Sequence, residues 1–169
     1  MALEGLVQWA HDVVEQGRRL GDALAEQTTA LASHDPAARR HSIHAVHAAC
    51  HHFVIAAYKL LEHREWADGH GLCADIDFCE IDQFPKDGIR DLRNMREHQI
   101  HYFRGQGRSS TRWLIETPEY RTDASSLVGS MIGGRLDWIN FAAAVERLVP
   151  VLRALPIPYP APAGECSHE

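Results

Sequence analysis

The sequence has little that would suit several common classes of protein. Only four of its 169 residues are cysteine, and Cys73 and Cys79 are not separated by the usual spacing of a zinc knuckle. Four scattered cysteines do not make a disulfide scaffold, so we expect a reduced, cytoplasmic protein. No apolar run approaches the roughly 20 residues that a membrane helix needs. The first residues have no basic leader before an apolar core, so we expect neither a membrane span nor a signal peptide.

Positive charge is also scarce overall, and this argues against a protein that binds nucleic acid over its whole surface. The chain has a net charge of −6, whereas nucleic-acid-binding proteins normally have a basic surface. The average conceals a local excess, because residues 86–112 contain seven basic and three acidic side chains. This segment carries a net charge of +4 and leaves −10 for the rest. Nucleic-acid binding by this segment therefore stays open.

Two long helices are predicted in the first half of the chain. Apolar residues recur with helical spacing from Leu3 to about Ser33, and again from Pro36 to about Trp66. Asp35 and Pro36 have the order of an N-cap followed by the first residue of a helix. Because the turn between the two helices is so short, they must lie antiparallel.

Two further helices are predicted in the second half, from Pro85 to Gly105 and from about Gly134 to Leu155. The first follows an acidic segment, residues 67–85, which we interpret as a solvated crossover. A β-prone run at residues 112–116 lies between the two helices, and we interpret its surroundings as a hairpin-like insertion.

The predicted fold class is therefore all-α. We expect a four-helix bundle with a short β-hairpin-like insertion, at about residues 105–131, before the last helix. Residues 1–155 would form this single domain. Alternating prolines predict an extended tail over residues 156–169.

The third predicted helix carries residues that could perform chemistry on RNA. Arg93 and His98 are separated by four residues, and Asn94 follows the arginine. A histidine can accept the proton of a 2′-hydroxyl or donate one to a leaving oxygen without a metal. An arginine can hold a phosphate with two hydrogen bonds and stabilise its developing charge. Asn94 could fix the orientation of either side chain.

A second pair has the same spacing, Arg96 and His101. Arg96 falls inside the apolar arc of the helix, where an unpaired charge is costly. It could pair with an acid on another helix, for which Asp12, Glu15 and Asp22 are candidates. Alternatively, it could face a cleft and bind substrate together with His101 and with Tyr102, which lies one helical turn after His98.

A helical bundle with Arg-Asn-x-x-x-His on its third helix resembles the HEPN superfamily (higher eukaryotes and prokaryotes nucleotide-binding). The resemblance implies catalytic roles for Arg93, Asn94 and His98 and a homodimer with the motif at its interface. It also implies metal-independent ribonuclease activity or RNA binding in a toxin or defence system, with no cofactor and with a separate antitoxin or partner protein. Some toxin members have a tyrosine two residues after the histidine, where this chain has Ile100.

Histidines are abundant, and they support an alternative interpretation. The chain has 12 histidines, and His44, His47 and His51 form one stripe on the second predicted helix. His47 and His51 could chelate a divalent ion, with His98 as a third ligand. That arrangement is similar to the three-histidine site of DinB-like four-helix bundles. The stripe is also explained as a semi-polar packing seam.

A non-catalytic function also remains open at this point. The protein could be a non-catalytic helical interaction protein that uses the same fold and motif for dimer packing. Trp113, in the insertion, is a candidate for stacking on a nucleic-acid base.

Overall fold

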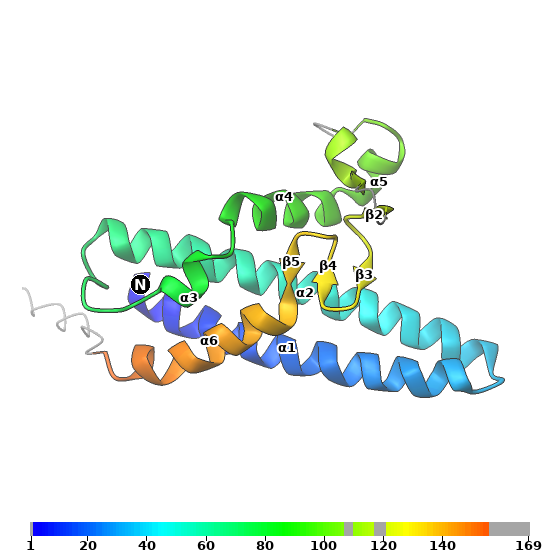
Figure 1. Ribbon diagram of the computed structural model, residues 1–169, viewed down its shortest axis with the longest axis horizontal. Helices are drawn as coiled ribbons and strands as arrows, with labels where there is room; N and C mark the ends of the chain where they lie inside the picture. Colours follow the sequence, from blue (N-terminus) through cyan, green and yellow to red (C-terminus); the bar gives the residue numbers. More distant parts are fainter. Residues whose placement is uncertain (1, 107–109, 117–120, 156–169) are drawn as a thin grey trace, which may run out of the picture.

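The computed structural model describes residues 2–106, 110–116 and 121–155. Helices α1 (Ala2–Ala32) and α2 (Pro36–Gly69) form a long antiparallel hairpin along the length of the molecule (Figure 1). The Asp35 side chain accepts a hydrogen bond from the Ala37 N–H at 2.8 Å, and Pro36 begins α2. Both features were predicted, and α2 continues three residues beyond the predicted end at Trp66.

Helix α6 (Trp138–Arg153) packs against α1, and the core lies between α1, α2 and α6. Gly17 lets α6 approach closely, because a Cβ at this position would lie 3.1 Å from the Ala142 Cβ. The ring of Phe53 on α2 has edge-to-face contacts with Trp138 and Phe141, at centroid distances of 6.2 and 6.3 Å.

The crossover between α2 and α4 is less exposed than its acidic composition predicted. It contains a short helix, α3 (Cys79–Asp82), which packs against α6. Cys73, Phe78 and Ile81 are buried in the core, so the crossover is solvated only in part. Its acids remain at the surface, where Asp82 pairs with Arg64 of α2.

The third predicted helix is two helices, so the expectation of one continuous helix to Gly105 is wrong. Helix α4 (Lys86–Glu97) ends at His98, which has φ −110° and ψ 28°, and α5 (Gln99–Phe103) follows. The apolar stripe of α4 ends at the same place, because Ile100 is 64% exposed. Tyr102 of α5 instead stacks on Trp113 of the insertion, with ring centroids 5.7 Å apart.

The insertion consists of short antiparallel strands packed beside α2 and α4. After a 3₁₀ turn (Ser110–Trp113), the strands pair as β1 with β2, and as β3, β4 and β5 in order. Their bounds are β1 Leu114–Glu116, β2 Arg121–Asp123, β3 Leu127–Val128, β4 Met131–Ile132 and β5 Leu136–Asp137. The last strand occupies residues that we predicted as the start of the fourth helix. Helix α6 therefore begins at Trp138, after the N-cap Asp137.

The coarse prediction is confirmed: the described chain is mostly helical, with small antiparallel sheets before the last helix. The finer expectation of a four-helix bundle, and of one domain over residues 1–155, stays a prediction. The extended tail predicted for residues 156–169 lies outside the described residues. Within the described part, no helix is both long and apolar enough to cross a membrane.

Candidate functional site

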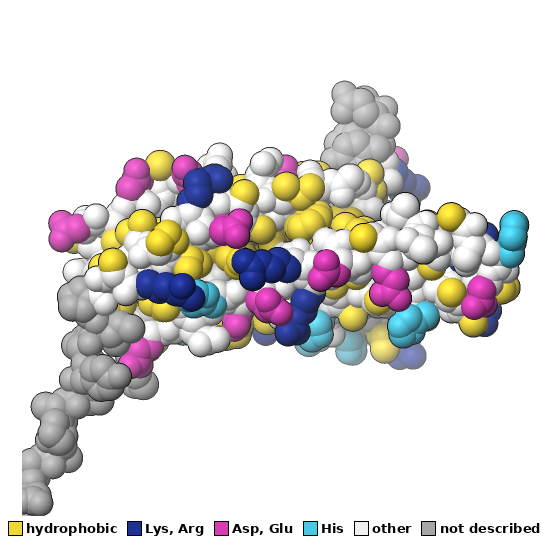
Figure 2. Space-filling model, turned by 90° about the horizontal axis from the view of Figure 1, so that it is seen from below, with side chains coloured by type: hydrophobic (Ala, Val, Ile, Leu, Met, Phe, Trp, Pro, Cys, Tyr) yellow, Lys and Arg dark blue, Asp and Glu magenta, His cyan; other side chains and the backbone are white. Residues whose placement is uncertain are grey.

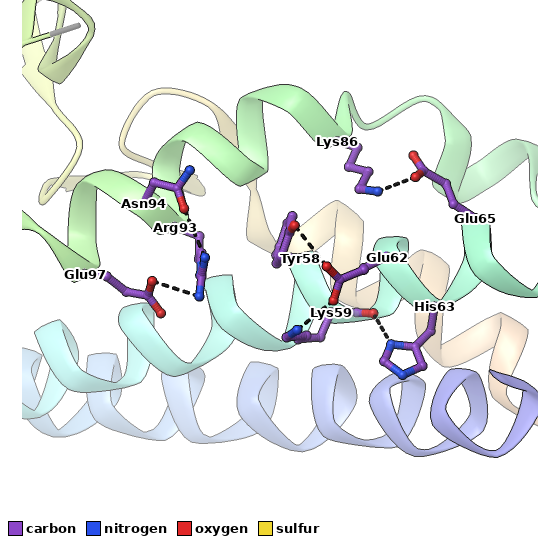
Figure 3. Close-up of polar contacts among 9 residues, drawn as sticks. All are labelled: Tyr58, Lys59, Glu62, His63, Glu65, Lys86, Arg93, Asn94 and Glu97. Atoms are coloured by element: carbon purple, nitrogen blue, oxygen red, sulfur yellow. Dashed lines mark hydrogen bonds and ion pairs between the residues drawn. The ribbon is translucent and has the colours of Figure 1, made fainter. Parts of the chain in front are cut away.

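Arg93 lies where α4 passes over α2, and its guanidinium is held from three sides (Figure 3). Its Nη1 donates to the Asn94 Oδ1 at 3.0 Å, and its Nη2 lies 2.9 Å from the Glu97 Oε2. The guanidinium carbon lies 5.5 Å from the centre of the Tyr58 ring. The Arg93 side chain is nevertheless 31% exposed, so part of it faces solvent.

Tyr58 connects Arg93 to a second group of polar residues on α2. Its hydroxyl donates to the Glu62 Oε1 at 3.1 Å, and the Lys59 Nζ donates to the Glu62 Oε2 at 2.6 Å (Figure 3). The hydrogen bond from Lys59 is the main reason why the pKa of Glu62 is lowered. This carboxylate is therefore charged at neutral pH and keeps Tyr58 beneath Arg93.

His98 and His101 are both exposed, at the junction of α4 and α5. Their ring centroids are 6.2 Å apart with an interplanar angle of 68°. No hydrogen bond, ion pair or ring contact between described residues joins Arg93 to His98. Arg93 and His98 therefore have no direct contact, whereas His98 lies beside His101, three residues further along the chain.

Arg96 has a different environment, because only 8% of it is exposed. Its Nη1 donates to the carbonyls of Ala124 and Ser125 at 2.9 and 3.2 Å, and its Nη2 donates to the His47 carbonyl at 3.1 Å. Burial lowers the pKa of Arg96, although the nearby Cys50 and Asp123 partly oppose the shift. Arg96 therefore joins α4, α2 and the insertion, and we do not include it among the substrate-binding groups.

The acids expected to pair with Arg96 are not its partners. Asp12 accepts a hydrogen bond from Gln8 at 3.1 Å, and Glu15 pairs with Arg19 on the same helix at 3.0 Å. Asp22 is exposed on α1. Backbone carbonyls accept from both terminal nitrogens of the buried guanidinium instead, whereas its Nε has no hydrogen-bond partner among the described residues. Residue types alone do not indicate this arrangement.

Tyr102 and Trp113 form a stacked pair that attaches α5 to the insertion. Trp113 is only 7% exposed, so the suggestion that it stacks on a nucleic-acid base is wrong. Tyr102 is partly buried against the core through this contact. Its placement supports a structural role, and we leave it out of the proposed site.

The histidine stripe on α2 faces the same region from below α4. Burial is the main cause of the lowered pKa of both His47 and His51, and Arg96 is the second cause in each case. The charges of Glu97 and Arg93 also act on His51. No group of three or more His, Cys, Asp or Glu side chains in the described ranges is arranged to hold a metal ion. His47, His51 and His98 are thus not brought together as the metal interpretation requires.

A cavity of about 230 Å³ opens next to His47. It lies between the α1–α2 hairpin and the insertion, and its lining includes Gln27, His47, Cys50, Ser125 and Leu127. Burial raises the pKa of the Cys50 thiol to about 11, so this cysteine is protonated at neutral pH and is a poor nucleophile.

The local excess of positive charge on residues 86–112 is largely neutralised. Four of its basic side chains form ion pairs, and a fifth, Arg96, is buried. The pairs are Lys86 with Glu65, Arg90 with Asp87, Arg93 with Glu97, and Arg112 with Asp91. Arg104 is exposed and has no side-chain partner among the described residues. The excess of charge in the sequence is therefore not an open basic surface over most of this segment.

Sequence reasoning missed the contributions of Glu97 and Tyr58 to this site, and it considered His51 only as a metal ligand. The i, i+4 spacing of Arg93 and Glu97 is a signal for their ion pair. Tyr58 and His51 come from another helix, and their position beneath α4 depends on packing that no local spacing indicates.

Comparison of the chain with protein-family models, with curated proteins and with solved structures found no match. The arguments that follow therefore rest on the residues and contacts described above.

Proposed function

We propose that the protein is a HEPN-like, metal-independent endoribonuclease that binds RNA at the exposed side of α4 and α5. Arg93 would bind a phosphate, His98 would transfer a proton, and Asn94 would hold the arginine in position. On this proposal the protein acts as a homodimer in the cytoplasm, within a toxin or defence system that includes a separate partner protein.

One observation carries the proposal: the arginine and the histidine of the motif are both accessible, and the alternative arginine is not. Arg93 is 31% exposed and His98 is exposed, whereas Arg96 is 8% exposed and bound to backbone carbonyls. A residue that binds or reacts with a large polyanion has to reach the surface. This contrast favours the pair Arg93 and His98 over the pair that includes Arg96.

The surroundings of Arg93 suit a guanidinium that keeps one orientation. Asn94, Glu97 and the Tyr58 ring each contact it, so little rotamer freedom remains to be lost when a ligand binds. Glu97 also offsets its charge, and an incoming phosphate must therefore compete with a carboxylate. A second, symmetry-related α4 packed beside the first would bring another Arg93 and His98 to the same site, which is the reason for including a homodimer in the proposal.

A second candidate function is favoured by that same carboxylate. Because Glu97 neutralises Arg93, the site also suits a helical interaction protein in which this ion pair only stabilises α4. The two functions predict different effects on RNA binding when Arg93 or Glu97 is replaced. Loss of Arg93 weakens RNA binding only in the first case.

The test is RNA binding by fluorescence anisotropy, with a labelled oligoribonucleotide in the presence of EDTA. Arg93→Gln should weaken binding by about tenfold, the effect of losing one charged phosphate contact. Glu97→Gln should strengthen it, because the competing carboxylate is removed.

Arg90→Gln is the matched control, since Arg90 is an exposed arginine on the same helix, paired with Asp87. It should bind RNA like the native protein. Equal affinity of the native protein, Arg93→Gln and Glu97→Gln would contradict a role for this site in RNA binding and favour the interaction protein.

A further inference from the structure

We propose that His101 is the second proton-transfer residue of the site, paired with His98 in the same chain. This inference rests on the proposed ribonuclease function and deepens it. It assigns general-acid and general-base catalysis to two adjacent imidazoles rather than to one histidine from each of two subunits.

The two histidines are three residues apart, and this spacing places them side by side at the junction of α4 and α5. His98 is the residue between the two helices, and its carbonyl accepts a hydrogen bond from the His101 N–H at 2.9 Å. This tight turn leaves the two rings 6.2 Å apart, centre to centre. Both side chains are exposed, so their rings can rotate quickly about their side-chain bonds to face a ligand.

Metal-free cleavage of RNA needs two proton transfers at one phosphorus. A neutral imidazole accepts the proton of the 2′-hydroxyl as the 2′-oxygen bonds to phosphorus. A protonated imidazole donates a proton to the 5′-oxygen as its bond to phosphorus breaks. The products are a 2′,3′-cyclic phosphate and a 5′-hydroxyl, and no metal, water or oxidant is consumed in this step.

The observed separation fits that requirement. The attacking and leaving oxygens lie on opposite sides of one phosphorus, and each imidazole nitrogen has to come within about 2.6–3.2 Å of its oxygen. Two rings centred 6.2 Å apart can contact both oxygens of a single phosphodiester. Histidine suits both steps because its two protonation states are both populated near neutral pH.

The same short helix also offers a cation for the phosphate. Arg104 follows α5 and is exposed, with no side-chain partner among the described residues. Arg93, by contrast, is paired with Glu97, and this carboxylate offsets its charge. Tyr102, which follows His101 in α5, stacks on Trp113 of the insertion, whereas His101 and Arg104 are exposed to solvent.

The experiment measures single-turnover cleavage of a 5′-labelled oligoribonucleotide in EDTA by the native protein and by His98→Asn, His101→Asn and His41→Asn. His41 is an exposed histidine of α2 outside the site and is the matched control. We expect each of the first two variants to lose about 100-fold or more in rate, the usual contribution of a general acid or base. RNA affinity should be retained, and circular dichroism should show native helix content.

The pH profile separates proton transfer from a structural effect. The native rate should follow a bell-shaped curve, and the residual activity of His101→Asn should lose one limb of it. An oligonucleotide with 2′-deoxyribose throughout should remain uncleaved, and the RNA product should carry a 2′,3′-cyclic phosphate.

Two outcomes would overturn the inference, and they can be told apart. Native-like cleavage by His101→Asn, together with loss of activity in His98→Asn, would remove His101 and leave the proposed function standing. Absence of cleavage by the native protein would overturn the ribonuclease function and this inference with it.

Discussion

Arg93 and Arg96 show how differently the fold treats two arginines on one short helix. Arg93 is partly exposed and held by side chains, whereas Arg96 is buried and held by backbone carbonyls. The sequence contains both with the same spacing to a histidine, so their order alone did not distinguish them. The distinction arises from Ala124 and Ser125, whose carbonyls reach Arg96 from a segment that is distant along the chain.

Replacement of Arg96 should therefore damage stability more than replacement of any paired surface arginine. Arg96→Met removes three hydrogen bonds to carbonyls of α2 and the insertion, and the cost should be about 2–3 kcal/mol in the free energy of unfolding. Urea denaturation followed by circular dichroism measures it. Arg90→Met, at an exposed ion pair, should cost less than about 1 kcal/mol. Equal costs for the two variants would contradict the structural role of Arg96.

The lowered pKa values of His47 and His51 make the stability depend on pH. In the unfolded chain both titrate near pH 6.5, and burial shifts the folded pKa below that value. At a pH between the folded-state pKa and the unfolded-state pKa, the unfolded chain therefore binds more protons than the folded chain. The contribution of the two histidines to the free energy of unfolding is thus fully present above about pH 6.5, and it is lost as the pH falls through their pKa in the folded state.

Urea denaturation at a series of pH values measures this effect. The double variant His47→Gln, His51→Gln should lose less stability than the native protein as the pH falls below about 6.5. The variant His34→Gln, on the exposed turn between α1 and α2, is the control and should follow the native curve. Parallel curves for the native protein and the double variant would show that neither histidine is responsible.

At the scale of elements, the long helices could be predicted and the insertion could not. The α1–α2 hairpin follows from periodic apolar residues and from the cap at Asp35, both of which are local signals. The break at His98 has no such signal, because α4 and α5 are compatible with one helix in composition. The stacking of Tyr102 on Trp113, which joins α5 to a later segment, also has no local signal. The proximity of His98 and His101, by contrast, is consistent with their i, i+3 spacing.

Two glycines of the insertion give a sharp test of how it docks. Gly133 and Gly129 both have positive φ, at 55° and 58°. A Cβ on Gly133 would lie 2.5 Å from the Leu92 Cδ1 and 3.1 Å from the Ala124 Cα, whereas one on Gly129 would meet open space. Gly129→Ala should thus cost about 1 kcal/mol from backbone strain alone. Gly133→Ala should cost more, because it also separates the insertion from α4.

Thermal or urea unfolding of the two variants, side by side, measures the difference. Equal destabilisation by Gly133→Ala and Gly129→Ala would mean that the insertion is not packed against Leu92 as described.

At the scale of the whole molecule, the charge is dispersed. On the face seen from below, basic and acidic side chains are interspersed along the molecule (Figure 2). The basic segment, residues 86–112, is also largely paired with acids. Because the chain has a net charge of −6 and the described part of the basic segment is largely paired or buried, we do not expect RNA to bind mainly through a broad electrostatic surface.

RNA binding should therefore depend only weakly on salt. Each phosphate contact with single-stranded RNA contributes about −0.7 to the slope of log K against log salt concentration. We expect a slope of about −0.7 to −1.4, from one or two contacts at Arg93 and Arg104. Anisotropy titrations over a series of KCl concentrations measure it. A slope steeper than about −4 would indicate a broad basic surface that the described residues do not present.

The central claim is that the exposed histidine of the motif takes part in cleaving RNA without a metal. The most direct measurement is the cleavage of a labelled oligoribonucleotide in EDTA by the native protein and by His98→Asn at equal concentration. The account predicts a 2′,3′-cyclic phosphate product with the native protein and a rate lower by about 100-fold or more with the variant. Equal cleavage by both proteins, or none by either, would contradict it.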